Sequence, residues 1–176
     1  GYIRFNRCHY GLSRSLIDFL LTSSRNKNTW LSLKRIVRFG ETDAAGVIHF
    51  HHLFRWAHES WEESLQSYGL VSEDIFPGCT ALNENPTVAL PIVHSSADFM
   101  LPVRTGDVIE VNIEPEKIDL ASFHVRFKFY LDKRLCSQVL IKHIAIESKT
   151  RKCSLLPRKI VLWLEASSVG TSIKPL

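Results

Sequence analysis

The segment from Ser122 to Asp132 constrains the fold of this chain more than any other, because its side chains alternate between apolar and polar. The apolar positions are Phe123, Val125, Phe127, Phe129 and Leu131, and the polar positions between them are His124, Arg126, Lys128 and Tyr130. A two-residue period predicts a β-strand with one buried face. Asp132 and Lys133 favour a hairpin turn into a second strand over Leu135–Glu147. The pair predicts an antiparallel sheet whose apolar face another layer of the domain has to cover.

An amphipathic helix that precedes the sheet is the candidate for that layer. From Leu53 onward, apolar and small side chains recur at intervals of three and four residues, which places them on one face of a helix. These residues are Leu53, Ala57, Ser60, Trp61, Ser64, Leu65 and Tyr68. The opposite face carries Arg55, Glu59, Glu62, Glu63 and Gln66. Gly69 is the expected stop signal, so the pattern predicts one helix of about four to five turns.

The remaining strands complete an α+β architecture. They are predicted over Leu33–Phe39, over Thr87–Phe99 with a kink near Pro91, over Asp107–Ile113, and as a last edge strand over Lys159–Leu164. One long helix cannot close a core alone, whereas an antiparallel sheet wrapped around it can. We therefore predict a sheet wrapped around one long central helix. Strand edges and apolar faces left uncovered predict a homodimer or homotetramer.

The composition is that of one globular domain, with 176 residues of which 45% are hydrophobic and 23% charged. No apolar run approaches the roughly 18–20 residues that a transmembrane helix needs. The formal charge of +4 comes from residues 1–38, which carry +7 against −3 in the rest of the chain. Basic charge confined to one terminal segment is poor evidence for a nucleic-acid surface on the domain. We therefore predict neither a nucleic-acid partner nor a membrane partner.

The cysteines are widely spaced, and no two of them form a CxxC pair. They are Cys8, Cys79, Cys136 and Cys153. This spacing predicts no zinc site and no disulfide framework, and it is typical of free thiols in a reducing compartment such as the cytoplasm.

The N-terminal segment differs in character from the rest. The chain starts at Gly1 and its only methionine is Met100, so we expect this start to be processed, trimmed or added. Residues 1–28 are rich in Arg and Ser and poor in acid, which is the composition of an organelle transit peptide and makes a plastid the alternative location. We expect residues 1–30 to be an extension, residues 31–165 to be the folded domain and residues 166–176 to be a tail.

The run ETDAAGVIHFHH, residues 41–52, lies just before the helix and holds the strongest candidate for chemistry. Asp43 either caps a turn or acts on a group that the following small residues leave room for. The nearby histidines suggest a metal site, and His58 and Glu62 lie one helical turn apart. However, no HExxH motif appears, and packed or surface histidines are the alternative. We expect no metal and no cofactor.

Together with the order of elements, the run GETDAAGVIHFHHLFRWAHESWEESL resembles the hotdog-fold thioesterases of the 4-hydroxybenzoyl-CoA thioesterase family. The TDxAGxxxF core carries this resemblance. The helix rich in tryptophan and glutamate is most similar to the subgroup that hydrolyses 1,4-dihydroxy-2-naphthoyl-CoA in phylloquinone biosynthesis. The resemblance covers roughly residues 31–165. It implies a hotdog fold and the hydrolysis of an aromatic acyl-CoA thioester.

The resemblance also implies a site at a subunit interface. Asp43 takes the position of the catalytic carboxylate, and the backbone N–H of Phe50 takes that of the donor which polarises the thioester carbonyl. Residues expected along the substrate are Gly46, His49, Trp56, His58 and Glu59. The basic residues expected to hold the CoA phosphates, by location only, are Lys149, Arg151 and Lys152.

This arrangement suits thioester hydrolysis, which needs attack on the carbonyl carbon and stabilisation of the oxyanion that forms. N–H groups at a helix N-terminus provide the second, and a carboxylate provides the first as nucleophile or general base.

Several alternatives stay open. Another branch of hotdog thioesterases has its carboxylate within the central helix, which would make Glu59 or Glu63 the base. Trp56 and Trp61 are either core residues or an aromatic wall for the acyl group, and His58 either contacts a substrate hydroxyl or lies on a solvated face. The alternative functions are a 4-hydroxybenzoyl-CoA thioesterase, a general acyl-CoA thioesterase and an acyl-binding module without catalysis.

Overall fold

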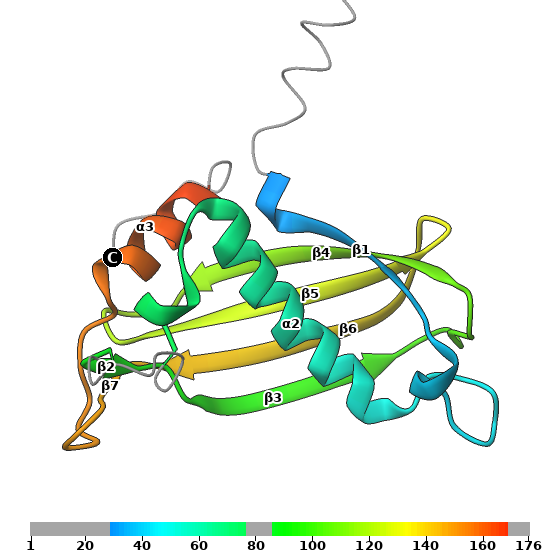
Figure 1. Cartoon of the computed structure of the whole chain (residues 1–176), viewed down its shortest axis with the longest axis horizontal. Coiled ribbons are helices and arrows are strands. Elements are labelled where there is room, and N and C mark those ends of the chain that lie inside the picture. Colours follow the sequence, from blue (N-terminus) through cyan, green and yellow to red (C-terminus); the bar gives the residue numbers. More distant parts are fainter. Residues whose placement is uncertain (1–28, 77–85, 169–176) are drawn as a thin grey trace, which may run out of the picture.

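The computed structural model describes residues 29–76 and 86–168, and its main elements form two layers (Figure 1). One layer is a five-stranded sheet in the order β1-β4-β5-β6-β3, in which every neighbouring pair is antiparallel. The strands are β1 Ser32–Ile36, β3 Ile92–Phe99, β4 Val108–Lys117, β5 Ser122–Leu131 and β6 Arg134–Ile144. Helix α2, Phe50–Tyr68, lies across one face of this sheet. The α+β architecture with one long central helix is confirmed.

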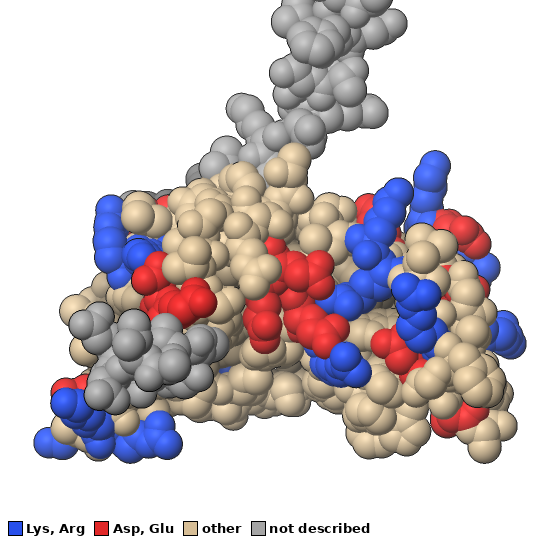
Figure 2. Space-filling model, viewed as in Figure 1, with Lys and Arg blue, Asp and Glu red and all other residues tan. Residues whose placement is uncertain are grey.

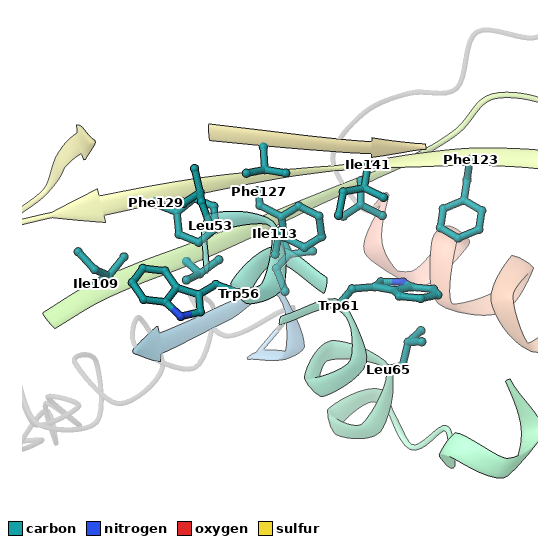
Figure 3. Packing of buried hydrophobic residues seen from close by; sticks show 14 of the residues in the cluster. Leu53, Trp56, Trp61, Leu65, Ile109, Ile113, Phe123, Phe127, Phe129 and Ile141 are labelled. Carbon is teal, nitrogen blue, oxygen red and sulfur yellow. The ribbon is translucent and has the colours of Figure 1, made fainter. Parts of the chain in front are cut away.

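The core lies between α2 and the sheet (Figure 3). From the helix come Leu53, Trp56, Trp61 and Leu65, and from the strands come Ile109, Ile113, Phe123, Phe127, Phe129 and Ile141. All of these side chains are at most 2% exposed. Burying an aliphatic or aromatic side chain of this size contributes about 1.5–3 kcal/mol. The alternating pattern of β5 and the helical pattern of α2 therefore meet in one apolar contact that fixes the helix on the sheet.

Helix α2 begins earlier and ends where the sequence predicts. It starts at Phe50, after His49 as the N-cap, because the apolar period detects only those turns that pack on the sheet. It ends at Tyr68 with Gly69 as the C-cap, whose φ of 103° lies in the left-handed region that favours glycine. The Leu70 N–H closes the helix by donating to the Leu65 carbonyl at 2.9 Å.

The hairpin between β5 and β6 is also confirmed. Asp132 and Lys133 form a two-residue loop with φ angles of 48° and 64°. Two successive positive φ angles are those of a type I′ turn, whose twist matches that of the flanking strands.

The predicted edge strand over Lys159–Leu164 is wrong, because this segment lies in helix α3, Arg158–Ser167. The buried residues of α3 are Ile160, Trp163 and Leu164. Their spacing of three and one residues places them on one helical face. Trp163 Nε1 donates to Ser64 Oγ at 3.2 Å, so α3 packs against the C-terminal half of α2. A short apolar run does not by itself distinguish a strand from a buried helix.

The long strand predicted over Thr87–Phe99 is divided in two. Strand β2, Val88–Ala89, pairs with β7, Ile146–Glu147, in a separate two-stranded sheet, and β3 starts only after Pro91. Proline lacks the N–H that a central strand needs, which favours a break at this point.

The two ends of the described chain meet beside α2. Trp30 lies in a 3₁₀ turn, Thr29–Leu31, and donates from Nε1 to Ser167 Oγ at 3.0 Å. Its ring also packs edge to face on Tyr68, with the centroids 5.2 Å apart. The rest of the expected extension and tail, residues 1–28 and 169–176, lies outside the described residues.

The cysteines within the described residues are free: Cys136 is buried and Cys153 is exposed. Cys8 and Cys79 lie outside the described residues. In the described part of the chain, no helix is both long enough and apolar enough to cross a membrane.

Candidate active site

Asp43 lies on an exposed, tightly closed loop that leads into α2. Its Oδ1 accepts a hydrogen bond from the Ala45 N–H at 2.8 Å, and its backbone carbonyl accepts one from the Gly46 N–H at 3.0 Å. Gly46 has a φ of 76°, which favours glycine at this position. The Asp43 N–H donates to the Val47 carbonyl at 2.9 Å. The carboxylate therefore stabilises its own turn with one oxygen and is accessible to solvent.

The N-terminus of α2 follows directly. His49, the N-cap, has an extended backbone with φ −69° and ψ 134°, and its side chain makes no capping hydrogen bond. Phe50 is the first helical residue, so its N–H belongs to the first turn, whose donors have no partner within the helix. The helix dipole concentrates partial positive charge at this end. An exposed carboxylate and a helix N-terminus thus lie at the same end of the sheet (Figure 1).

The histidines of this region interact with one another. His51 Nδ1 and His49 Nδ1 lie 2.6 Å apart, and the His51 ring packs on His52 with a centroid distance of 3.9 Å. Desolvation is the largest cause that lowers the pKa of His51, and electrostatic repulsion from His52 and His49 lowers this pKa further. Within residues 29–76 and 86–168, no three His, Cys, Asp or Glu side chains are grouped so as to hold a metal ion.

The two glutamates considered as alternative bases are held in an ion-pair network on α2. Arg35 of β1 donates to Glu59 Oε2 at 3.0 Å and to Glu63 Oε1 at 2.7 Å. Arg55 donates to the other Glu59 oxygen at 2.6 Å. Figure 2 shows the acidic side chains that gather over the middle of α2, next to basic ones. Both carboxylates thus have a cation as partner, whereas Asp43 has a backbone N–H.

Trp56 and His58 both lie about two turns after Phe50 on α2. Trp56 is 2% exposed and donates from Nε1 to Glu41 Oε1 at 2.9 Å. His58 is partly exposed, and its Nδ1 lies 2.7 Å from Glu62 Oε1. The His58 ring also lies 5.5 Å from the ring of Trp61, centroid to centroid.

The basic turn does not join these residues within one chain. Lys149, Arg151 and Lys152 follow β7 at the opposite end of the sheet from the Asp43 loop (Figure 1). Figure 2 shows basic side chains gathered at that corner of the molecule. Within one chain, the basic turn and the Asp43 loop therefore lie apart.

No sequence pattern assigns a function to Glu41, which the structure places at the centre of the loop's contacts. Its side chain bonds both Trp56 and the Arg38 N–H. The one sequence signal is its position three residues after Arg38, which is where the glutamate of a capping box stands.

An antiparallel sheet around one long helix, with an exposed aspartate just before that helix, defines a hotdog domain of the thioesterase type. The chain belongs to the thioesterase-like superfamily, whose family model matches residues 37–164. It is 53% identical over 145 residues to the 1,4-dihydroxy-2-naphthoyl-CoA hydrolase of Prochlorococcus marinus strain MIT 9313, which covers 82% of this chain and 96% of that protein.

Two crystal structures resemble this one closely. One is of a protein from Prochlorococcus marinus strain MIT 9313, with a TM-score of 0.78 and 53% identity over 81% of this chain and 99% of that one. The other is a 1,4-dihydroxy-2-naphthoyl-CoA thioesterase from Synechocystis, with a TM-score of 0.65 and 25% identity over 76% of this chain and 94% of that one. The hotdog fold expected from the sequence is confirmed.

Proposed function

We propose that this protein hydrolyses the thioester of an aromatic acyl-CoA, with 1,4-dihydroxy-2-naphthoyl-CoA as the preferred substrate, to the free acid and CoA. The observation that carries the proposal is the exposed Asp43 carboxylate on the loop that leads into the N-terminus of α2. The 53% identity to a hydrolase of that name supports the choice of substrate. We also place the protein in the 4-hydroxybenzoyl-CoA thioesterase family, and its reaction in phylloquinone biosynthesis in the cytoplasm or a plastid.

In the proposed reaction, the carbonyl oxygen of the thioester accepts a hydrogen bond from the Phe50 N–H, and the helix dipole stabilises the oxyanion. Asp43 either takes a proton from the water that attacks the carbonyl carbon, or attacks that carbon itself to form an anhydride that water then opens. In both routes the carbon–sulfur bond breaks, and CoA leaves as a thiolate that takes up a proton. Ala44 and Gly46 leave room for the thioester beside the loop backbone.

The acyl group is proposed to lie along the first three turns of α2, past His49. Glu59 belongs to this stretch, and His58 is the candidate for contact with a naphthoyl hydroxyl, whereas the Trp56 side chain lies in the core beneath it. The bond from His58 to Glu62 holds the imidazole in one orientation, which favours a directional contact.

The site is proposed to form between copies of the chain in a homodimer or homotetramer. Strand β3 lies at the edge of the sheet and exposes Ile92, Val93 and Phe99, each about half accessible. A second copy would bring the basic residues of its own turn toward the Asp43 loop of the first, where they would hold the CoA phosphates. These residues are Lys149, Arg151 and Lys152. Light scattering that finds only monomers at micromolar concentration would contradict this arrangement.

The substrate is tested by kcat/KM for the CoA thioesters of dihydroxynaphthoate, 4-hydroxybenzoate, benzoate and butyrate, with release of free thiol as the signal. We expect the dihydroxynaphthoyl thioester to be cleaved best, because a site that hydrogen-bonds a hydroxyl discriminates strongly against analogues without one. Equal or faster cleavage of butyryl-CoA would indicate a general acyl-CoA thioesterase. Cleavage of the 4-hydroxybenzoyl thioester alone would make 4-hydroxybenzoyl-CoA the substrate. If none of the four thioesters were cleaved, the protein would be a binding module.

A further inference from the structure

We propose that Glu41 is a positioning residue for thioester hydrolysis, because it holds the Asp43 loop against the N-terminal part of α2. The inference rests on the proposed function, since the effect of Glu41 passes through Asp43.

Glu41 contacts three separate parts of the chain. Its Oε1 accepts a hydrogen bond from Trp56 Nε1 at 2.9 Å, and its Oε2 accepts one from the Arg38 N–H at 2.8 Å. Its backbone carbonyl accepts one from the His49 N–H at 2.9 Å. A single residue thus connects the segment after β1, the N-cap of α2 and a side chain on the second turn of that helix.

Trp56 is a firm anchor for this contact. Its side chain is 2% exposed and packs against Phe129 of β5, with the ring centroids 6.4 Å apart. A buried indole N–H needs an acceptor, and Glu41 provides it. Because Trp56 and Phe50 lie on the same rigid helix, the bond from Glu41 to Trp56 also sets the position of the loop relative to the Phe50 N–H.

The loop transmits this position to Asp43. The two ends of the loop are joined by the hydrogen bond from the His49 N–H to the Glu41 carbonyl and by the β-bridge between Thr42 and Ile48. Asp43 comes directly after the first end, and Phe50 comes directly after the second. Any shift of Glu41 therefore changes the separation between the carboxylate and the helix N-terminus, and a misplacement of about 1 Å costs on the order of 100-fold in rate.

The first test compares Glu41→Ala and Glu41→Gln with the wild type on 1,4-dihydroxy-2-naphthoyl-CoA. We expect Glu41→Ala to lower kcat by about 10- to 100-fold and to change KM by less than about threefold, because Glu41 orients Asp43 and does not bind the acyl-CoA. Glu41→Gln keeps the side-chain length and one acceptor oxygen, so its kcat should lie between that of Glu41→Ala and that of the wild type. If Glu41→Ala does not fold, Glu41→Gln against wild type carries the test.

The control is Glu114→Ala. Glu114 also accepts a hydrogen bond in the wild type, from Lys128 at 2.8 Å, but it lies on the outer face of the sheet. This variant should keep the wild-type kcat.

The second test places the Glu41 substitutions in an Asp43→Asn background. If Glu41 acts through Asp43, they lower kcat no further there, because residues that act as a unit are not additive. The same fold-loss in both backgrounds would show that Glu41 acts independently and would overturn the inference.

The remaining outcomes separate this inference from the proposed function. If Asp43→Asn loses its activity but both Glu41 variants keep wild-type kcat, the inference is overturned and the proposed function stands. If Asp43→Asn itself keeps wild-type kcat, the catalytic role of Asp43 is contradicted and its positioning by Glu41 with it, whereas the proposed function falls only if the wild type cleaves none of the thioesters.

Discussion

Mild acid should destabilise this protein through one buried histidine, His143 of β6. Its imidazole is 1% exposed and stacks between Phe123 and Trp61, with ring centroids 5.0 Å and 4.4 Å away. Its Nδ1 lies 3.0 Å from the Leu90 carbonyl, so the neutral ring donates that bond from Nδ1. Burial lowers the pKa of His143 to about 4, opposed by the bond to Leu90 and reinforced by nearby His58.

The direction and size of the effect follow from this pKa. An unfolded chain has a histidine pKa of about 6.5, so as the pH falls below that value the unfolded state binds a proton that the folded state does not. The contribution of neutral His143 to the free energy of unfolding is therefore fully present above about pH 6.5 and is lost as the pH falls toward 4. Proton linkage for this pair of values gives a loss of about 2 kcal/mol at pH 5 and about 3 kcal/mol at pH 4.

The assay is urea unfolding at several pH values between 7 and 4, followed by tryptophan fluorescence. His143→Asn keeps an N–H donor near Leu90 but has no titrating group, so its loss of stability between pH 7 and 5 should be smaller than that of the wild type by about 2 kcal/mol. His124→Asn is the control, because His124 lies on the outer face of the sheet next to Glu116. Equal losses of stability in His143→Asn and the wild type over this range would refute a contribution of His143 to the pH dependence.

Two further substitutions test contacts of α2. Trp163→Phe should lower the free energy of unfolding by about 1–3 kcal/mol, because it leaves the fully buried Ser64 hydroxyl without its donor, and adding Ser64→Ala should recover part of the loss in urea unfolding. Arg35→Met should cost about 1–2 kcal/mol, because Glu59 and Glu63 lose their shared cation. The cost should shrink as salt screens the two carboxylates, and an effect of the same size in 1 M salt would count against an electrostatic origin.

The elements with strong, long patterns could be predicted from the sequence. Strand β5 can be predicted because the alternation of apolar and polar residues runs through ten residues, and a two-residue turn indicates its hairpin. The end of α2 was marked by Gly69, whose positive φ a side chain would strain. In each case the local preference and the packing of the domain favour the same structure.

Other parts depend on contacts that one sequence does not display. Helix α3 looked like a strand because its apolar run is short, and its helical state is stabilised by the burial of Trp163 against α2. The motif indicates Asp43 as the candidate carboxylate, whereas no sequence pattern indicates the contact of Glu41, because its partner Trp56 lies fifteen residues away on another element. The sequence also does not predict that the basic turn lies far from the Asp43 loop, since this separation depends on the topology of the whole sheet.

The proposed mechanism depends on Asp43, which attacks the thioester or activates the water that does, and kcat of Asp43→Asn on 1,4-dihydroxy-2-naphthoyl-CoA tests this most directly. Asparagine keeps an oxygen that accepts the Ala45 N–H, so the loop and the thermal unfolding temperature should not change. We expect kcat to fall by about 100-fold or more, because the amide is neither a nucleophile nor a base. A turnover near that of the wild type would contradict the account and would make Glu59 or Glu63 the candidate base.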